Sequence, residues 1–182
     1  MMRFSTSQDG FISLFRNRNF RLGLVNSLVI ALVAIAVLWL DQYTKHLVLA
    51  KFHACGAAYE ICDSYVVVPH LLKWTYERNF HGAFGLFGSN AVMLIGMAIV
   101  VLVLFWYSFR EAAARSRVVR VAFGVIVGGA IGNIVDRLHY GYVIDFIDFY
   151  RIWPNIFNVA DSCITVGVAL LLLSSLVARR HA

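Results

Sequence analysis

The sequence predicts an all-α membrane protein with four transmembrane helices and a small extracytoplasmic β-sheet between the first two helices. Of its 182 residues, 60% are hydrophobic and only 14% are charged, and the mean hydropathy is +0.74. Soluble domains usually carry about 25% charged residues. A soluble chain of this length has too little interior for so much apolar surface. The composition therefore indicates a membrane protein, which we expect to form a single domain over residues 1–182.

Four apolar segments are each close to the ~20 residues that a helix needs to cross a bilayer. They are Leu22–Leu40, Ala91–Phe109, Val118–Val135 and a segment from about Asn158 to Ala178. The first two contain no charged residue, whereas polar groups enter the ends of the other two. A cleaved signal peptide is the alternative for the first segment, but its length and the lack of a nearby small-residue cleavage site favour a retained helix.

Charged residues are divided unequally between the two sides that four spans would define. Residues 1–21, 110–120 and 179–182 hold ten arginines, no lysine and two acids. Residues 41–90 and 136–157, with Asp161, hold six basic residues and eight acids. Because a basic excess marks the cytoplasmic side, we expect both termini in the cytoplasm, including segment 1–21, and extracytoplasmic loops at 41–90 and 136–157. Topology then explains the pI of about 9.5, and no nucleic-acid partner is required.

The first outer loop contains a strand pattern. In LLKWTYER, the apolar side chains of Leu72, Trp74 and Tyr76 alternate with polar ones, as in a half-buried strand. The valines at 66–68 indicate a second short strand before it. We expect the apolar face to rest on the membrane surface or to cover a site there.

Cysteine and histidine positions do not predict a metal or cofactor site. The six histidines lack metal-ligand spacing, and the sequence contains no nucleophile elbow. Cys55 and Cys62 lie in the first outer loop, where an oxidising compartment permits a disulfide between them and free thiols are the alternative. Cys163 is expected to be a small buried residue in the fourth segment.

Polar side chains cluster at the outer ends of the apolar segments, where they are costly and indicate function. They are Asp41, Lys45, Asn79, Asn133, Asp136, Arg137, Asn158 and Asp161, with Asp145 and Asp148 in the loop before the last segment. Some have a structural explanation. Asp41 and Lys45 have the spacing of an i,i+4 ion pair, and Arg137 is placed to bind a neighbouring carboxylate through a bidentate fork.

Paired carboxylates are the chemistry that these residue types support. Two aspartates in a low-dielectric site cannot both ionise easily, so one keeps a shared proton. The ionised partner then takes a proton from water, while the protonated partner polarises a carbonyl and later protonates the leaving amine. This predicts a pair made of Asp161 and one of Asp136, Asp145 or Asp148, and spacing does not choose among the three. The alternatives are a proton-coupled transporter, which requires acids near the middle of the bilayer, and a non-catalytic scaffold.

Five blocks of the chain resemble the motifs of the bacterial lipoprotein signal peptidases (signal peptidase II). DQYTK at 41–45 is similar to DQx[ST]K, and NFHGAFG at 79–85 to NxGxAFG, although His81 stands where the family usually has glycine. GGAIGNIVDR at 128–137 matches GGAxGNxxDR. VIDFID at 143–148 is similar to VxDFID, and FNVADS at 157–162 to FNxADS. The blocks occur in family order, and the last three are highly specific together.

The resemblance implies an aspartic endopeptidase of the bacterial cytoplasmic (inner) membrane with its active site at the outer face. Such an enzyme removes signal peptides from diacylglyceryl-modified prolipoproteins by cutting just before the lipidated cysteine. The motifs imply that Asp145 and Asp161 are catalytic. Supporting or substrate-binding positions implied by the motifs are Asp41, Lys45, Asn79, Asn133, Asp136, Arg137 and Asn158. The resemblance also implies contact with membrane lipid, inhibition by the cyclic peptide globomycin and no cofactor. Because four spans can enclose one site, we expect a monomer.

Overall fold

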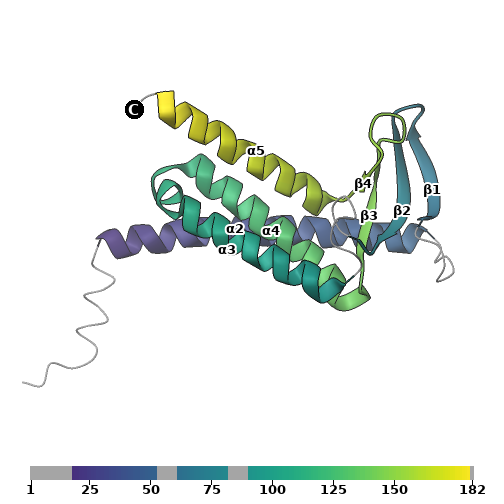
Figure 1. The fold of residues 1–182 in the computed structure, drawn as a ribbon, viewed down its shortest axis with the longest axis horizontal. Helices are drawn as coiled ribbons and strands as arrows, with labels where there is room; N and C mark the ends of the chain where they lie inside the picture. The colour runs from purple at the N-terminus through teal and green to yellow at the C-terminus, as the bar shows by residue number, and fades with distance from the viewer. Residues whose placement is uncertain (1–17, 53–60, 82–89, 181–182) are drawn as a thin grey trace, which may run out of the picture.

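Four long helices make up most of the structure, a computed structural model that describes residues 18–52, 61–81 and 90–180 (Figure 1). They are α2 (Arg18–Lys51), α3 (Ala91–Arg115), α4 (Arg117–Tyr140) and α5 (Val159–Arg180). Each is long and apolar enough to cross a membrane. The prediction of a four-helix membrane protein is therefore confirmed.

Helices α2 and α4 extend past the expected spans at the end of the bundle that bears the sheet, and α3 extends past Phe109 at the other end. Helix α2 continues beyond Leu40 to Lys51, so the start of the expected first loop is helical. Helix α4 continues beyond Val135 to Tyr140 and stops at Gly141, whose φ of 83° lies in the left-handed region that glycine adopts easily. The extensions of α2 and α4 place polar side chains of the DQYTK and GNIVDR blocks on regular helix. Their spacing is consequently fixed by helical geometry.

Helix α4 lies at the centre of the bundle and packs against α2, α3 and α5. In its most apolar window 50% of the residues are buried, against 6% to 17% for the other helices. Glycines permit this close approach, as is usual between membrane helices. A Cβ added at Gly128 would lie 2.5 Å from the carbonyl oxygen of Ala34 in α2, and one at Gly129 would lie 2.6 Å from that of Ala160 in α5.

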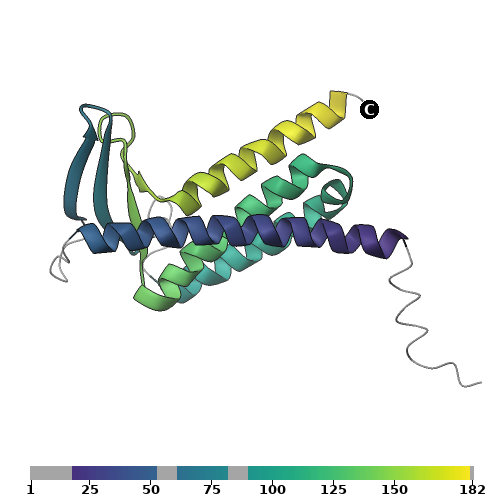
Figure 2. The same ribbon diagram turned by 180° about the vertical axis from the view of Figure 1, so that it is seen from behind.

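A four-stranded antiparallel sheet stands at one end of the bundle (Figures 1 and 2). Its order is β1 (Ile61–Val68), β2 (Leu72–Asn79), β3 (Val143–Asp148) and β4 (Ile156–Phe157). The hairpin of β1 and β2 confirms the predicted sheet between the first two helices. The second outer loop adds β3 and β4, which periodicity did not predict because β3 is buried on both faces for most of its length.

A β-bulge interrupts the pairing of β2 with β3. Trp74 pairs with Ile147 and Glu77 pairs with Asp145, so two residues of β2 lie opposite Phe146 alone. The bulge breaks the expected alternation. Trp74 is 39% exposed, whereas Tyr76 is only 4% exposed. The prediction that Leu72, Trp74 and Tyr76 form one continuous apolar face is therefore wrong.

Tyr76 instead belongs to a hydrophobic cluster that joins the sheet to α2. Its buried members are Val48, Phe52, Tyr76, Ile144 and Phe146. This cluster holds β3 against the C-terminal part of α2, beside the polar residues of both elements. The sheet thereby acts as a rigid support for side chains that β3 directs toward the helices.

Candidate active site

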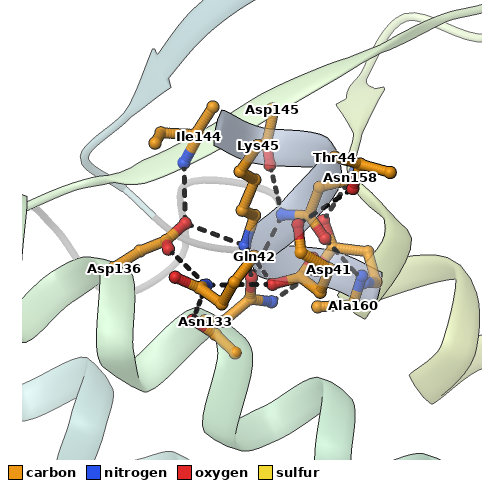
Figure 3. Close-up of polar contacts among 12 residues, drawn as sticks. Asp41, Gln42, Thr44, Lys45, Asn133, Asp136, Ile144, Asp145, Asn158 and Ala160 are labelled. Atoms are coloured by element: carbon orange, nitrogen blue, oxygen red, sulfur yellow. Dashed lines mark hydrogen bonds and ion pairs between the residues drawn. The ribbon is translucent and has the colours of Figure 1, made fainter. Parts of the chain in front are cut away.

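A buried lysine joins two aspartates between helices α2 and α4 (Figure 3). Lys45 Nζ lies 2.8 Å from Asp41 Oδ2 and 2.8 Å from Asp136 Oδ2, and it donates to Asn133 Oδ1 at 3.1 Å. Lys45 is 1% exposed and both aspartates are fully buried. The predicted ion pair between Asp41 and Lys45 is confirmed, and Asp136 joins it from the neighbouring helix.

The carboxylates of this ion-pair cluster also bind backbone groups of the neighbouring elements. Asp41 Oδ1 accepts a hydrogen bond from the backbone N–H of Ala160, in the first turn of α5, at 2.9 Å. Asp136 Oδ2 accepts one from the N–H of Ile144 in β3 at 3.1 Å. The cluster of Asp41, Lys45 and Asp136, called the brace below, thus fixes α2, α4, α5 and β3 relative to one another.

Gln42 is a member of the site that sequence reasoning missed. Its Nε2 donates to Asp136 Oδ1 at 2.9 Å, to Asp41 Oδ2 at 3.2 Å and to the carbonyl oxygen of Gly132 at 3.3 Å. The signal was present in the DQYTK block, where the glutamine is a named motif position. The carboxylates of Asp41 and Asp136 can accept more hydrogen bonds than Lys45 alone donates, and the Gln42 amide supplies further ones.

The side chain of Asn158 contacts both Asp145 and Asp161. Asn158 Nδ2 donates to Asp145 Oδ1 at 2.6 Å, while Asn158 Oδ1 accepts from the backbone N–H of Asp161 at 2.8 Å. Asn79 Nδ2 donates to Asp145 Oδ2 at 2.8 Å, and Asn133 Nδ2 donates to Asp161 Oδ1 at 2.7 Å. Three amides therefore hold the two carboxylates in one shared network.

The other two candidate partners of Asp161 have different surroundings. Asp136 is bound to Lys45, so its charge is balanced within the brace. Asp148 accepts a hydrogen bond from Thr75 Oγ1 at 2.8 Å. Asp148 is three residues from Asp145 on β3, so its side chain leaves the opposite face of the strand. The network around Asn158 therefore includes Asp145 and neither of the other two.

The electrostatic environment of Asp145 favours its protonated form. Asp145 is fully buried. Burial raises the pKa of its carboxyl well above the ordinary value, and the negative charges of Asp161 and Glu77 raise it further. The hydrogen bond from Asn79 and the charge of Lys45 act in the opposite direction but do not offset burial. A proton is therefore available at Asp145 at a pH where an exposed aspartate is ionised.

Arg137 does not form the expected bidentate pair with a carboxylate. Within the described chain its Nη1 donates to the carbonyl oxygen of Asn133 at 3.4 Å, and its buried Nε has no hydrogen-bond partner. The reason is that Lys45 already occupies Asp136, the nearest carboxylate along α4. Arg137 still contributes positive charge near Asp136, Asp145 and Asp161.

Among the described cysteines and histidines, His81 contacts this network, through its backbone. Cys62 is disulfide-bonded and Cys163 is a free thiol, whereas Cys55, the partner considered for Cys62, lies outside the described residues. The backbone N–H of His81 donates to Asn79 Oδ1 at 3.1 Å. No group of three or more His, Cys, Asp or Glu side chains in the described segments is arranged to hold a metal ion.

The helices and the buried carboxylate network define a multi-pass membrane protein with a polar site at the sheet-bearing end of its bundle. The family model described as signal peptidase (SPase) II matches residues 33–177, which include every site residue named above. The chain belongs to the signal peptidase II family, as its motifs predicted, and it is a membrane peptidase.

Individual relatives agree with this assignment. The lipoprotein signal peptidase of Halothermothrix orenii is 36% identical over 148 residues, which cover 80% of this chain and 93% of that protein. The lipoprotein signal peptidase of Caldanaerobacter subterraneus subsp. tengcongensis is 39% identical over 142 residues, covering 78% of this chain and 92% of that protein.

Solved structures agree as well. A bacterial membrane enzyme structure determined by the in meso method shares 33% identity and a TM-score of 0.68, covering 81% of this chain and 87% of that one. A second has 34% identity and a TM-score of 0.67, covering 81% of this chain and 92% of the other. Each likeness therefore covers 81% of this chain.

Proposed function

We propose that this peptidase removes signal peptides from diacylglyceryl-modified prolipoproteins by aspartic catalysis, cutting just before the lipidated cysteine. The names of its relatives, which are lipoprotein signal peptidases, support the substrate class. The observation that carries the mechanism is the amide network in which Asn158 contacts both Asp145 and Asp161. Two carboxylates held this way provide one acid and one base without a cofactor.

In the proposed reaction Asp145 is the acid and Asp161 the base. Asp145 holds the shared proton and donates a hydrogen bond to the scissile carbonyl oxygen. Asp161 takes a proton from a water molecule, whose oxygen bonds to the carbonyl carbon. When the tetrahedral intermediate collapses, the C–N bond breaks and the amine of the lipidated cysteine leaves with a proton from the pair. The assignment follows from the buried, proton-retaining environment of Asp145.

Substrate access is proposed from the side of Asp161. Asp145 is fully buried, whereas Asp161 is half-buried at the start of α5. The helices α2 and α5 expose many apolar side chains along their length, among them Leu32, Leu172 and Leu173. Acyl chains of the substrate can therefore remain in lipid beside these helices while the scissile bond reaches the polar network.

The proposed orientation has both termini in the cytoplasm and the site at the outer face of a bacterial inner membrane. The start of α2, the end of α5 and the connection between α3 and α4 lie at the end of the bundle away from the sheet (Figures 1 and 2). Four arginines flank that connection, at positions 110, 115, 117 and 120. A basic excess of this kind favours the cytoplasmic side.

Purified protein incubated with a lipidated and an unlipidated prolipoprotein tests the proposal. We expect cleavage of the lipidated form alone, and we expect globomycin to inhibit it. Asp145→Asn and Asp161→Asn should each abolish cleavage while the protein accumulates in the membrane. The matched variant Asp148→Asn, on the other face of β3, should keep wild-type activity. Absence of inhibitor-sensitive cleavage by the wild-type protein would refute the function, and full activity of either catalytic variant would refute the pair.

A further inference from the structure

Glu77 lies directly opposite Asp145 on the neighbouring strand. The two residues are register partners in the antiparallel pair of β2 and β3. Side chains of such partners leave the same face of the sheet, with Cβ atoms roughly 4.5–5.5 Å apart. Two carboxylates therefore face one another beside the site, in an arrangement that is destabilising when both are charged.

The β-bulge creates this pairing. If β2 continued from Trp74 without an extra residue, Tyr76 would lie opposite Asp145. The inserted residue instead brings Glu77 and Asn79 to the face of Asp145. The hydrogen bond from Asn79 Nδ2 to Asp145 Oδ2, at 2.8 Å, supports this arrangement. Bulges commonly redirect side chains next to active sites.

We propose that Glu77 is a positioning carboxylate whose charge, brought opposite Asp145 by the bulge, keeps the shared proton on Asp145 and sets the upper pH limit of cleavage. This inference rests on the proposed aspartic function, because only a carboxylate pair needs one member to stay protonated. Glu77 acts through Asp145 and contacts no reacting atom in the proposed mechanism.

Charged side chains from four elements surround Asp145. Helix α2 contributes Lys45 and Asp41, and α4 contributes Asp136 and Arg137. Helix α5 contributes Asp161, and β2 contributes Glu77. Arg78, the next residue of β2, is the register partner of Ile144 and lies on the other face of the sheet.

Lys45 is largely neutralised by its two aspartates in the brace. The carboxylates that oppose ionisation of Asp145 are therefore Asp161 and Glu77, acting in addition to burial. Of these two, only Glu77 can be altered without removing a member of the proposed catalytic pair.

The pH dependence of kcat/KM on a lipidated prolipoprotein tests the inference. Glu77→Gln removes the charge and keeps the shape, so we expect the alkaline limb of the profile to move to lower pH. Coulomb's law across ~6 Å, at effective dielectric constants between about 80 and 20, gives a shift of roughly 0.5–2 pH units. Glu77→Asp keeps the charge and should retain most of the wild-type limb. Asp148→Asn removes a carboxylate from the opposite face and should leave the limb in place.

Superimposable profiles of wild type and an active Glu77→Gln variant would overturn the inference while leaving the proposed function intact. A wild-type protein that cleaves no prolipoprotein would refute the function itself. A second measurement does not depend on activity. Glu77→Gln should reduce the decline of melting temperature with rising pH, and it should do so less in an Asp145→Asn background. Equal effects in the two backgrounds would show that Glu77 does not act through Asp145.

Discussion

Asn158 donates a hydrogen bond of 2.6 Å to Asp145, from a position three residues before Asp161 on the chain. The same side chain accepts the backbone N–H of Asp161 at 2.8 Å, in the manner of a helix N-cap. One residue thus begins α5 and aligns Asp145 with the first turn of that helix. The geometry of the site and the start of α5 are therefore coupled.

Asn158→Ala should lower kcat/KM for a lipidated prolipoprotein. Loss of a hydrogen bond to a charged or proton-sharing group costs about 1.5–3 kcal/mol, which corresponds to roughly 10–150-fold in rate. The matched variant Asn26→Ala, whose amide binds the carbonyl oxygen of Ala114 at the other end of the bundle, should keep wild-type kinetics. Equal activities of the two variants would show that Asn158 does not align the carboxylates.

Asp145→Asn should flatten the dependence of stability on pH. The pKa of Asp145 is raised in the folded protein, so between its ordinary value and its folded value the folded state binds more protons than the unfolded state. Stability contributed by this group is therefore present at low pH and is lost as pH rises through the folded pKa. Melting temperatures measured between about pH 5 and pH 8 should fall less in the variant than in wild type. A variant with the wild-type slope would contradict the assignment of a retained proton to Asp145.

Lys45→Met should destabilise the protein strongly. The change leaves Asp41 and Asp136 buried without their counter-ion, and breaking a buried pair in this way typically costs about 3–5 kcal/mol. Adding Asp136→Asn should recover part of the loss, because one of the two unbalanced charges disappears. The melting temperature of the purified protein and its abundance in the membrane measure both effects.

Lys51→Met provides the comparison for the brace. Lys51 is exposed and its Nζ lies 4.2 Å from the ring centre of Tyr65 and 5.1 Å from that of Trp74. Exposed contacts of this type contribute about 0.5–1 kcal/mol. A loss of stability in Lys45→Met no greater than in Lys51→Met would exclude the brace as a structural element.

The sequence was sufficient for the features that depend on local pattern. The four spans follow from apolar segments of about 20 residues, and the pairing of Asp41 with Lys45 follows from helical spacing. The choice of Asp145 among three aspartates required the family motifs, because it depends on how β3 pairs with β2 and not on any local period. The bulge opposite Phe146 leaves no mark in hydrophobic alternation, so the face of Tyr76 was predicted wrongly.

The contacts of Arg137 also could not be predicted from the local sequence pattern. Its positive charge predicted a carboxylate partner, but partner choice depends on competition in three dimensions. Lys45, 92 positions before Arg137 in the chain, forms the ion pair with Asp136 and also donates to Asn133 Oδ1. Gln42 likewise acquires its role only when α4 packs against α2.

Gly128→Ala should destabilise the bundle, and Gly96→Ala should not. A Cβ at Gly128 would lie 2.5 Å from the carbonyl oxygen of Ala34 and 2.8 Å from Val37 Cβ, so α2 and α4 must separate. Overpacking of this kind costs about 1–3 kcal/mol. A Cβ at Gly96 meets no atom within 4 Å. Melting temperatures of the two variants give the comparison.

The same pair of variants tests whether helix spacing controls the site. Gly132, one turn from Gly128, lies so close to α2 that its own Cβ would be 2.5 Å from Asp41 Oδ2. Separation of the helices at Gly128 should therefore lengthen the contacts of Lys45 with Asp136 and Asn133. Because Asn133 also binds Asp161 at 2.7 Å, cleavage should fall in Gly128→Ala by more than the unfolded fraction explains. Activity that merely tracks the amount of folded protein would show that the spacing of α2 and α4 matters for stability alone.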